Sequence, residues 1–136
     1  GPEIANSKNG GSIVNISSDL GIIAPDQRLY RQSKLKESEQ PVKPVSYSVI
    51  KSGLIGLTRY VATYWGPQKV RCNALCPGGV FNDQSDILIS RLENLIPLGR
   101  MADVDEYKGA IQFLCADASS YMTGTCLIID GGRTCW

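Results

Sequence analysis

The sequence predicts an α/β fold with a parallel sheet. Short β-rich runs alternate with segments of helical periodicity, in the order strand, helix, strand, helix, helix, strand. The connections between most of them are short, and the last strand, residues 126–129, is a continuous apolar run of the kind buried on both faces of a parallel sheet. Such a succession forms right-handed βαβ units. We therefore expect three parallel strands packed between helices.

The first strand and the segment after it differ sharply in composition. Residues 12–18 (SIVNISS) are β-rich and bounded by glycines, which predicts a strand that ends near Ser18. Residues at about 25–44 are polar and charged and contain three prolines. That composition predicts a surface insertion, with one short helical turn, within a single domain spanning residues 1–136.

The longest predicted helix begins at Ser46 and is stopped by Gly66-Pro67. Apolar residues recur in it at steps of three and four, and we expect this stripe to dock the helix on the sheet. The stripe consists of Leu54, Leu57, Val61 and Tyr64, widened by Ile55 and Tyr60. Tyr47 and Lys51 lie in the first turns of this helix.

Beyond that helix, residues 70–76 alternate as a short strand that ends at Pro77-Gly78-Gly79, and residues 87–95 have helical spacing. Asp103 and Glu106 form a D-x-x-E capping box for another helix that runs to about Cys115. Its expected inner face carries Tyr107, Ala110, Ile111 and Leu114. Ligands of parallel sheets bind beyond the carboxyl ends of the strands, so Ser18, Tyr47 and the Pro77 loop are expected to converge there.

Composition excludes several classes of function. The net charge of +1 is spread along the 136 residues, which argues against a nucleic-acid or membrane partner. Five cysteines without a CxxC pair, and no histidine, predict no metal site and fit a reducing cytoplasm. No apolar run approaches the length of a membrane span, and the start lacks a signal-peptide pattern. We expect a soluble cytoplasmic protein.

Two pentapeptides, YSVIK (Tyr47 to Lys51) and YRQSK (Tyr30 to Lys34), place a tyrosine four residues before a lysine. On a helix these side chains share a face, and an ammonium favours the phenolate form of a neighbouring tyrosine, which can then act as an acid or base. A serine beside it can hold a carbonyl or alcohol oxygen while a nicotinamide exchanges hydride with the adjacent carbon. The amphipathic helix favours Tyr47, whereas the segment around Tyr30 lacks an apolar face that could dock it.

Several blocks in order resemble the short-chain dehydrogenase/reductase family, from Gly11 to the end of the chain. Ser18, three residues before Gly21, looks like the active-site serine, and YSVIKSGLIGLTR looks like the YxxxK segment. RCNALCPGG resembles the strand and loop that follow in the family, and residues 97–132 resemble its C-terminal signature. The resemblance implies the C-terminal part of a Rossmann-type doubly wound sheet and decides for Tyr47 and Lys51 over Tyr30 and Lys34.

The resemblance also implies roles. Ser18 binds the substrate oxygen, Tyr47 is the acid or base, and Lys51 stabilises its phenolate and binds the nicotinamide ribose of NAD or NADP. The cofactor-binding loop comprises Pro77, Gly78, Gly79, Val80 and Asn82. The implied reaction is hydride transfer between the nicotinamide and a small-molecule carbonyl or secondary alcohol. The family commonly pairs the long helix and the last strand across two-fold axes, so a homodimer or homotetramer is expected.

Departures from the family pattern qualify this expectation. Tyr47 follows Ser18 by 29 positions, which is longer than usual and is why we place the insertion at about 25–44. Asn82 stands where a threonine is common. The chain contains no GxGxxG phosphate loop and therefore lacks the N-terminal glycine-rich half, so the isolated chain is expected to be inactive.

Two further hypotheses remain from the sequence. The insertion and the ending GGRTCW resemble family members associated with bacterial surface-sugar biosynthesis, which suggests a nucleotide-linked or acidic sugar as substrate. The alternative function is a non-catalytic oligomerisation or scaffold module derived from the same fold, in which YSVIK is only a helix start.

Overall fold

The computed structural model describes residues 2–136. Its helices and strands are α1 (Pro2–Ala5), β1 (Gly11–Ile16), α2 (Val45–Trp65), β2 (Val70–Pro77), α3 (Asp86–Glu93), α4 (Lys108–Cys115) and β3 (Cys126–Ile129). The predicted order of strand, helix, strand, helix, helix, strand is confirmed, with the short helix α1 as an unpredicted addition. Among the helices of residues 2–136, none combines the length and the apolar character that crossing a bilayer requires.

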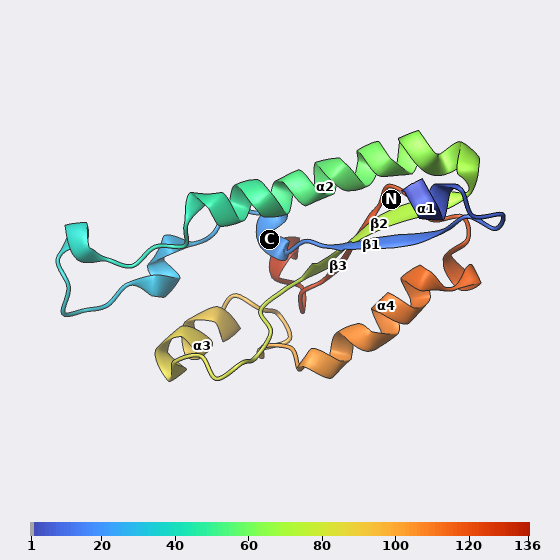
Figure 1. Cartoon of the computed structure of the whole chain (residues 1–136). Helices are drawn as coiled ribbons and strands as arrows, with labels where there is room; N and C mark the ends of the chain where they lie inside the picture. Colours follow the sequence, from blue (N-terminus) through green and yellow to red (C-terminus); the bar gives the residue numbers. More distant parts are fainter. Residues whose placement is uncertain (1) are drawn as a thin grey trace.

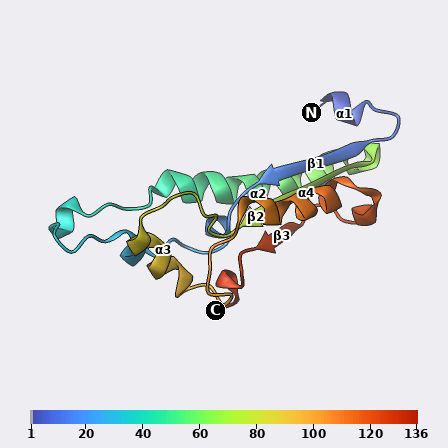
Figure 2. The same cartoon turned by 90° about the horizontal axis from the view of Figure 1, so that it is seen from below.

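The strands form one parallel sheet in the order β1-β2-β3. β1 pairs with β2 along its whole length, and β3 pairs with the second half of β2. Helix α2 lies over one face of the sheet and α4 over the other (Figure 1). Seen from below, α4 crosses in front of the strands and α2 lies behind them (Figure 2). Within residues 2–136, the outer edge of β1 has no strand beside it.

Alternate residues of the central strand β2 face the two helical layers. Ala74 packs against Ile55 of α2, whereas Leu75 packs against Tyr107 and Leu114 on the α4 side. Because successive side chains of a strand point to opposite faces, this one strand supplies both halves of the core. Ala74, Leu75 and Leu114 are at most 1% exposed.

Helix α2 docks on the sheet through a narrow face made of Ile55, Thr58 and Ala62. Thr58 is fully buried although it is polar, because its hydroxyl accepts from the Asn15 amide at 2.9 Å and donates to the Leu54 carbonyl at 2.7 Å. Small and internally satisfied side chains let the helix approach the strands closely.

Part of the stripe that we expected to dock α2 instead faces outward. Leu57, Tyr60 and Tyr64 are 48%, 63% and 61% exposed, and the two tyrosine rings stack with their centroids 5.6 Å apart. We call these three residues the outer stripe. The helix thus has two apolar faces, and periodicity alone could not tell which one packs on the sheet.

The expectation that β3 is buried on both faces is wrong for this chain. Leu127 and Ile129 pack into the cluster under α4, but Ile128 points to the opposite face and is 41% exposed. On that face α2 packs on β1 and β2, so the edge strand is left partly uncovered. Ile111, predicted on the inner face of α4, is likewise 40% exposed.

The predicted capping box precedes α4, where it begins a 3-10 turn, η5 (Val104–Tyr107), that leads into the helix. The backbone N–H of Asp103 donates to the Glu106 carboxylate at 2.8 Å, and Arg100 donates to both Glu106 oxygens at 2.7 Å. The Arg100 side chain, followed by the Asp103 backbone, lowers the pKa of Glu106 to about 2.

All five cysteines are unpaired. Burial raises the pKa of Cys72, and it raises that of Cys76 to about 11, where the neighbouring Cys126 adds to the rise. These buried thiols therefore stay protonated at neutral pH and act as small apolar side chains. Cys126 is partly buried, and Cys115 and Cys135 are exposed.

Two glutamines close the segment predicted as an insertion, residues 25–44, which we call the arm. The Gln27 side chain exchanges hydrogen bonds with the Lys43 backbone at 2.9 and 3.3 Å, and that of Gln40 does so with the Gln32 backbone at 2.8 and 2.9 Å. The arm contains two 3-10 turns, η2 (Gln27–Tyr30) and η3 (Glu37–Glu39), where one short helical turn was expected.

The arm extends beyond the end of the sheet together with α3 (Figure 1). Leu29 of the arm joins Leu92, Ile96 and Met101 in a small separate core. Arg91 of α3 donates from Nη1 to three backbone carbonyls at the end of η2, at 2.6 to 3.3 Å. These contacts hold the arm against α3.

Candidate active site

Two serines, Ser17 and Ser18, directly follow the last residue of β1 at the carboxyl edge of the sheet. Ser17 Oγ donates to the Lys51 carbonyl at 2.7 Å and thereby ties the strand end to α2. Ser18 is 6% exposed, has an extended backbone and caps the 3-10 turn η1 (Asp19–Gly21). Glycine is needed at position 21, because an added Cβ would lie 2.7 Å from Ser17 Oγ and 3.0 Å from the Lys51 backbone.

Lys51 links the end of β1 to Tyr47. Its Nζ donates to the carbonyl of Ile16, the last residue of β1, at 3.0 Å, and lies 5.6 Å from the centroid of the Tyr47 ring. Tyr47 and Lys51 stand one helical turn apart on α2 and share a face. The structure therefore brings this pair to the strand end from which Ser18 follows.

Lys43 of the arm also contacts Tyr47 and was absent from the predicted site. Its Nζ lies 3.9 Å from the ring centroid, within the range of a cation–π interaction. The lysine precedes Tyr47 by four positions, but it lies before α2 begins, so helical spacing gave no reason to select it.

The second Tyr-x-x-x-Lys pair does not share a helix face. Turn η2 ends at Tyr30, and Lys34 lies in an exposed turn of the arm. Burial raises the pKa of the Tyr30 phenol; Arg133 opposes this effect, and the charges of Asp19 and Tyr47 add to it. Tyr30 is thus partly buried, and it is not paired with Lys34.

The loop at residues 77–80 leaves β2 and passes against the end of β3. The Gly78 N–H donates to the Ile129 carbonyl at 2.9 Å, and an added Cβ at Gly78 would lie 2.7 Å from Asp130 Cα. Glycine is therefore required by this close approach. Asn82, two residues beyond the loop, is exposed.

The same edge of the sheet holds a buried ion pair that the sequence did not predict. Arg133 Nη1 lies 2.6 Å from Asp19 Oδ2, and the two side chains are 7% and 4% exposed. Arg133 belongs to the 3-10 turn η7 (Arg133–Cys135), 114 residues beyond Asp19. Asp19 directly follows Ser18 and could have been suspected from that position, but no pattern in GGRTCW identified its partner.

Known proteins resemble this chain along nearly its whole length. The family model described as "Enoyl-(Acyl carrier protein) reductase" matches residues 3–134. Post-translational flagellin modification protein A of Campylobacter coli is 30% identical over 90% of the chain, and the ribulose-forming D-arabinitol 2-dehydrogenase of Candida tropicalis is 35% identical over 99%. A crystal structure of a short chain dehydrogenase from Leptospira borgpetersenii, with bound NAD+, covers 91% of the chain at 36% identity with a TM-score of 0.81.

The match is confined to part of each relative. This chain spans 45% of both curated proteins and 44% of the Leptospira chain. The shared part includes the parallel sheet with β1, β2 and β3 and the helices that cover it. Family model, relatives and solved structure agree, and the chain belongs to the short-chain dehydrogenase/reductase family.

Proposed function

We propose that this chain is the C-terminal half of a nicotinamide-dependent oxidoreductase that acts on a small-molecule carbonyl or secondary alcohol. The observation that carries the proposal is the contact of Lys51 with both the end of β1 and the ring of Tyr47. This contact supports an acid or base at the carboxyl edge of the sheet, close to Ser18, where ligands of parallel sheets bind.

In the proposed mechanism each residue handles the substrate oxygen or the proton on it. Tyr47 takes the proton of an alcohol or returns one to the oxygen of a carbonyl. Ser18 forms a hydrogen bond with the same oxygen, and Lys51 holds its ammonium beside the Tyr47 ring.

The residues at this edge fit the nicotinamide end of NAD or NADP. Lys51 offers a charged donor beside Tyr47 that suits ribose hydroxyls, and loop 77–80 contributes two glycines with partly exposed backbone. Val80 and Asn82 extend this proposed contact surface. When bound, the nicotinamide carries the hydride. The chain contains no glycine-rich phosphate loop, so the choice between NAD and NADP is made outside it.

We propose a hydroxylated substrate with an anionic group, such as an acidic or nucleotide-linked sugar. A cavity of about 520 Å³ lies between the arm and α3, and Tyr30 forms part of its wall. Arg31, Lys34 and Arg91 line it together with polar groups such as Ser85, and within residues 2–136 no carboxylate does. Arg31 is already paired with Glu37, so Lys34 and Arg91 supply the positive charge that favours an anion, and the arm would form one wall of the substrate site.

We also propose that the protein assembles as a homodimer or homotetramer in a reducing compartment, the cytoplasm. The outer stripe on α2 and the exposed Ile128 of β3 leave apolar surface on two elements, which supports contact with a second copy. The five unpaired cysteines support the choice of compartment.

Substitution of Tyr47 by phenylalanine tests the proposed function in a full-length protein that carries this chain. Loss of the phenol is expected to lower cofactor-dependent turnover by about 10²–10⁴-fold, because general acid–base catalysis contributes that range. Tyr121→Phe is the matched control, since it removes a fully exposed phenol that lies outside the proposed site, and it is expected to keep the rate. Undiminished hydride transfer in Tyr47→Phe would remove Tyr47 from the mechanism.

The isolated 136-residue chain is expected to bind neither NAD(H) nor NADP(H) tightly, because it lacks the glycine-rich half that holds the phosphates. Titration calorimetry with each cofactor checks this expectation. Tight binding of either cofactor by the isolated chain would show that these 136 residues are sufficient to form the cofactor site.

A further inference from the structure

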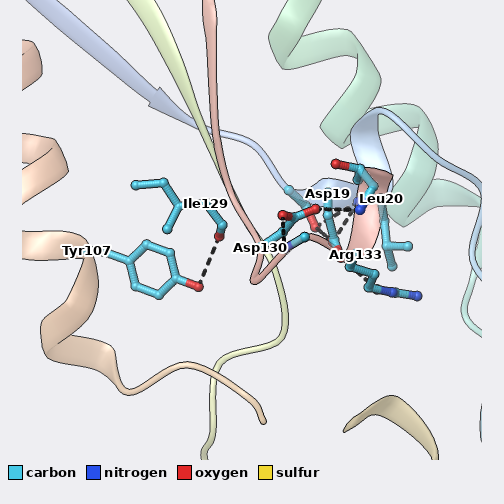
Figure 3. Close-up of polar contacts among 9 residues, drawn as sticks. Asp19, Leu20, Tyr107, Ile129, Asp130 and Arg133 are labelled. Carbon is cyan, nitrogen blue, oxygen red and sulfur yellow. Dashed lines mark hydrogen bonds and ion pairs between the residues drawn. The ribbon is translucent and has the colours of Figure 1, made fainter. Parts of the chain in front are cut away.

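The three proposed catalytic residues are not held equally firmly. Ser18 is almost completely buried and precedes Asp19, whose ion pair with Arg133 joins the turn after β1 to the turn after β3 (Figure 3). Lys51 is tied to the end of β1 by a hydrogen bond. Tyr47, by contrast, is only partly buried, and within the part of the chain that the structure describes it lies outside the apolar clusters. Apolar packing therefore does not fix the orientation of its ring, although an acid or base needs a fixed geometry to exchange a proton.

Of the two ammonium groups that contact the Tyr47 ring, the closer one comes from the arm. Lys43 Nζ lies 3.9 Å from the ring centroid, and Lys51 Nζ lies 5.6 Å from it. At such distances an ammonium is attracted by the electron-rich face of the ring. Within residues 2–136 no carboxylate forms an ion pair with Lys43, so no such pair competes with the ring for this ammonium. The contact therefore restrains the ring from one of its faces.

The backbone of Lys43 is fixed independently of its side chain. Gln27 Oε1 accepts a hydrogen bond from the Lys43 N–H at 2.9 Å, and Gln27 Nε2 donates to the Lys43 carbonyl at 3.3 Å. The next residue, Pro44, is the N-cap of α2, and its carbonyl accepts from the Tyr47 N–H at 3.1 Å. Proline also has a nearly fixed φ. The ammonium and the ring are therefore both carried by backbone that is fixed where the arm joins α2.

We infer that Lys43 is a positioning residue for the proposed reaction, whose ammonium holds the Tyr47 ring so that the phenol stays directed at the substrate oxygen. This inference rests on the proposed role of Tyr47 and deepens it. Lys43 acts through Tyr47 and does not touch the reacting atoms. The arm carries Lys43 and is itself held against α3 by Arg91, so it contributes to the catalytic geometry as well as to the proposed wall of the substrate site.

The variant Lys43→Met keeps the aliphatic stem of the side chain and removes its charge. In a full-length protein that carries this chain, it is expected to lower the single-turnover rate of hydride transfer by about twofold to fivefold, the range that a cation–π contact at a partly exposed site contributes. Lys43→Arg is expected to keep most of the rate, because a guanidinium also binds the face of an aromatic ring. Lys36→Met is the matched control, since it removes an exposed ammonium elsewhere in the arm, and it is expected to keep the rate.

The probes are D-gluconate and D-arabinitol, each with NAD and with NADP, because both are polyols and only gluconate carries a carboxylate. A positioning residue acts on the tyrosine, so the rate at saturating probe is expected to fall by the same factor for both probes, with little change in the half-saturating concentration. A lysine that bound the carboxylate would weaken the binding of D-gluconate alone. Weaker binding of D-gluconate with an unchanged saturated rate therefore overturns the inference, as does an equal fall of the rate in Lys43→Met and Lys43→Arg.

A second measurement needs no substrate. In protein labelled with ¹³C at the ε carbons of the tyrosine rings, NMR relaxation gives an order parameter for each ring, which reports its motion on the picosecond to nanosecond timescale. The order parameter of Tyr47 is expected to fall in Lys43→Met and to stay unchanged in Lys43→Arg and in Lys36→Met. Loss of the resonance in Tyr47→Phe assigns it.

The two measurements distinguish the inference from the proposed function. An unchanged order parameter of Tyr47 in Lys43→Met overturns the inference whether or not either probe is turned over. A lower order parameter in that variant, together with no cofactor-dependent turnover of either probe by the unmodified protein, supports the restraint on the ring but counts against the proposed oxidoreductase.

Discussion

Asp19 and Arg133 stabilise the fold only as a pair, because each is buried. Arg133→Leu is expected to lower the free energy of unfolding by about 3–5 kcal/mol, since it leaves the Asp19 charge buried and uncompensated. The double variant Asp19→Asn, Arg133→Leu is expected to recover part of this loss, because no buried charge remains. Urea denaturation of the three proteins measures both values.

The exposed pair of Arg28 with Asp26 provides the comparison. Arg28 is 84% exposed at its side chain, and Arg28→Leu is expected to cause a clearly smaller loss than Arg133→Leu. Equal stability of the single and double variants at positions 19 and 133 would mean that the buried charge is not what destabilises Arg133→Leu.

At the residue scale, local spacing in the sequence could place candidate site residues relative to one another, while their roles remain proposals. Tyr47 and Lys51 follow from a helical turn, and Ser18 from its place after a strand. Arg133 could not be found in this way, because it meets Asp19 through the tertiary fold, and Lys43 was not selected because it lies before α2 begins. Arg133 meets Asp19 across 114 residues, and no local period encodes such a contact.

At the scale of single elements, close backbone approach makes some glycines far more sensitive than others. Gly78→Ala is expected to cost about 1–3 kcal/mol, because the new Cβ would meet Asp130 Cα at 2.7 Å and would force the loop away from β3. Gly109→Ala is the matched control: it lies in α4 with nothing within 4 Å of the added carbon. It is expected to stabilise the protein by about 0.5–1 kcal/mol through helix propensity.

Thermal unfolding of the two glycine variants checks this contrast. Equal midpoints for Gly78→Ala and Gly109→Ala would indicate that the loop yields without cost. A lower midpoint for Gly78→Ala alone would support tight packing of the loop against the end of β3, where the proposed cofactor surface lies.

The sequence predicted the elements better than it predicted their exposed faces. Helix α2 ends where Gly66-Pro67 indicated, and the capping box of Asp103 and Glu106 lies where it was expected. The outer stripe and Ile128 were misjudged, since an apolar side chain has the same pattern whether its partner lies in the same chain or elsewhere. The arm was predicted only as polar surface, and the glutamine closures that order it have no periodic signature.

At the scale of the whole molecule, the topology could be predicted because strands joined by helical crossovers allow few arrangements. The chain spans 45% of the curated relatives reported above, and the outer edge of β1 is unpaired within residues 2–136.

Self-association through the outer stripe is testable at this scale. Leu57→Glu is expected to reduce the assembly to a smaller species, because it buries a charge in the proposed contact between two copies of α2. Arg59→Glu places a carboxylate on an exposed part of the helix that is not three or four residues from any member of the outer stripe, and it is expected to leave the assembly unchanged. Sedimentation velocity measures the size of both. An unchanged size in Leu57→Glu would exclude this face from the contact.

The large separation of Asp19 and Arg133 in the sequence also affects the order in which the ion pair can form during biosynthesis. A ribosome adds Asp19 to the growing chain 114 residues before Arg133, which at roughly 5–20 residues per second is a delay of about 6 to 23 s. During that interval the strand, the turn and Ser18 have all left the ribosomal active centre, but the cation that holds Asp19 has not been made. The ion pair of Asp19 therefore forms only after residue 133 has been synthesised, and a nascent chain that terminates just before Arg133 would carry every proposed catalytic residue while the buried Asp19 carboxylate lacked its partner.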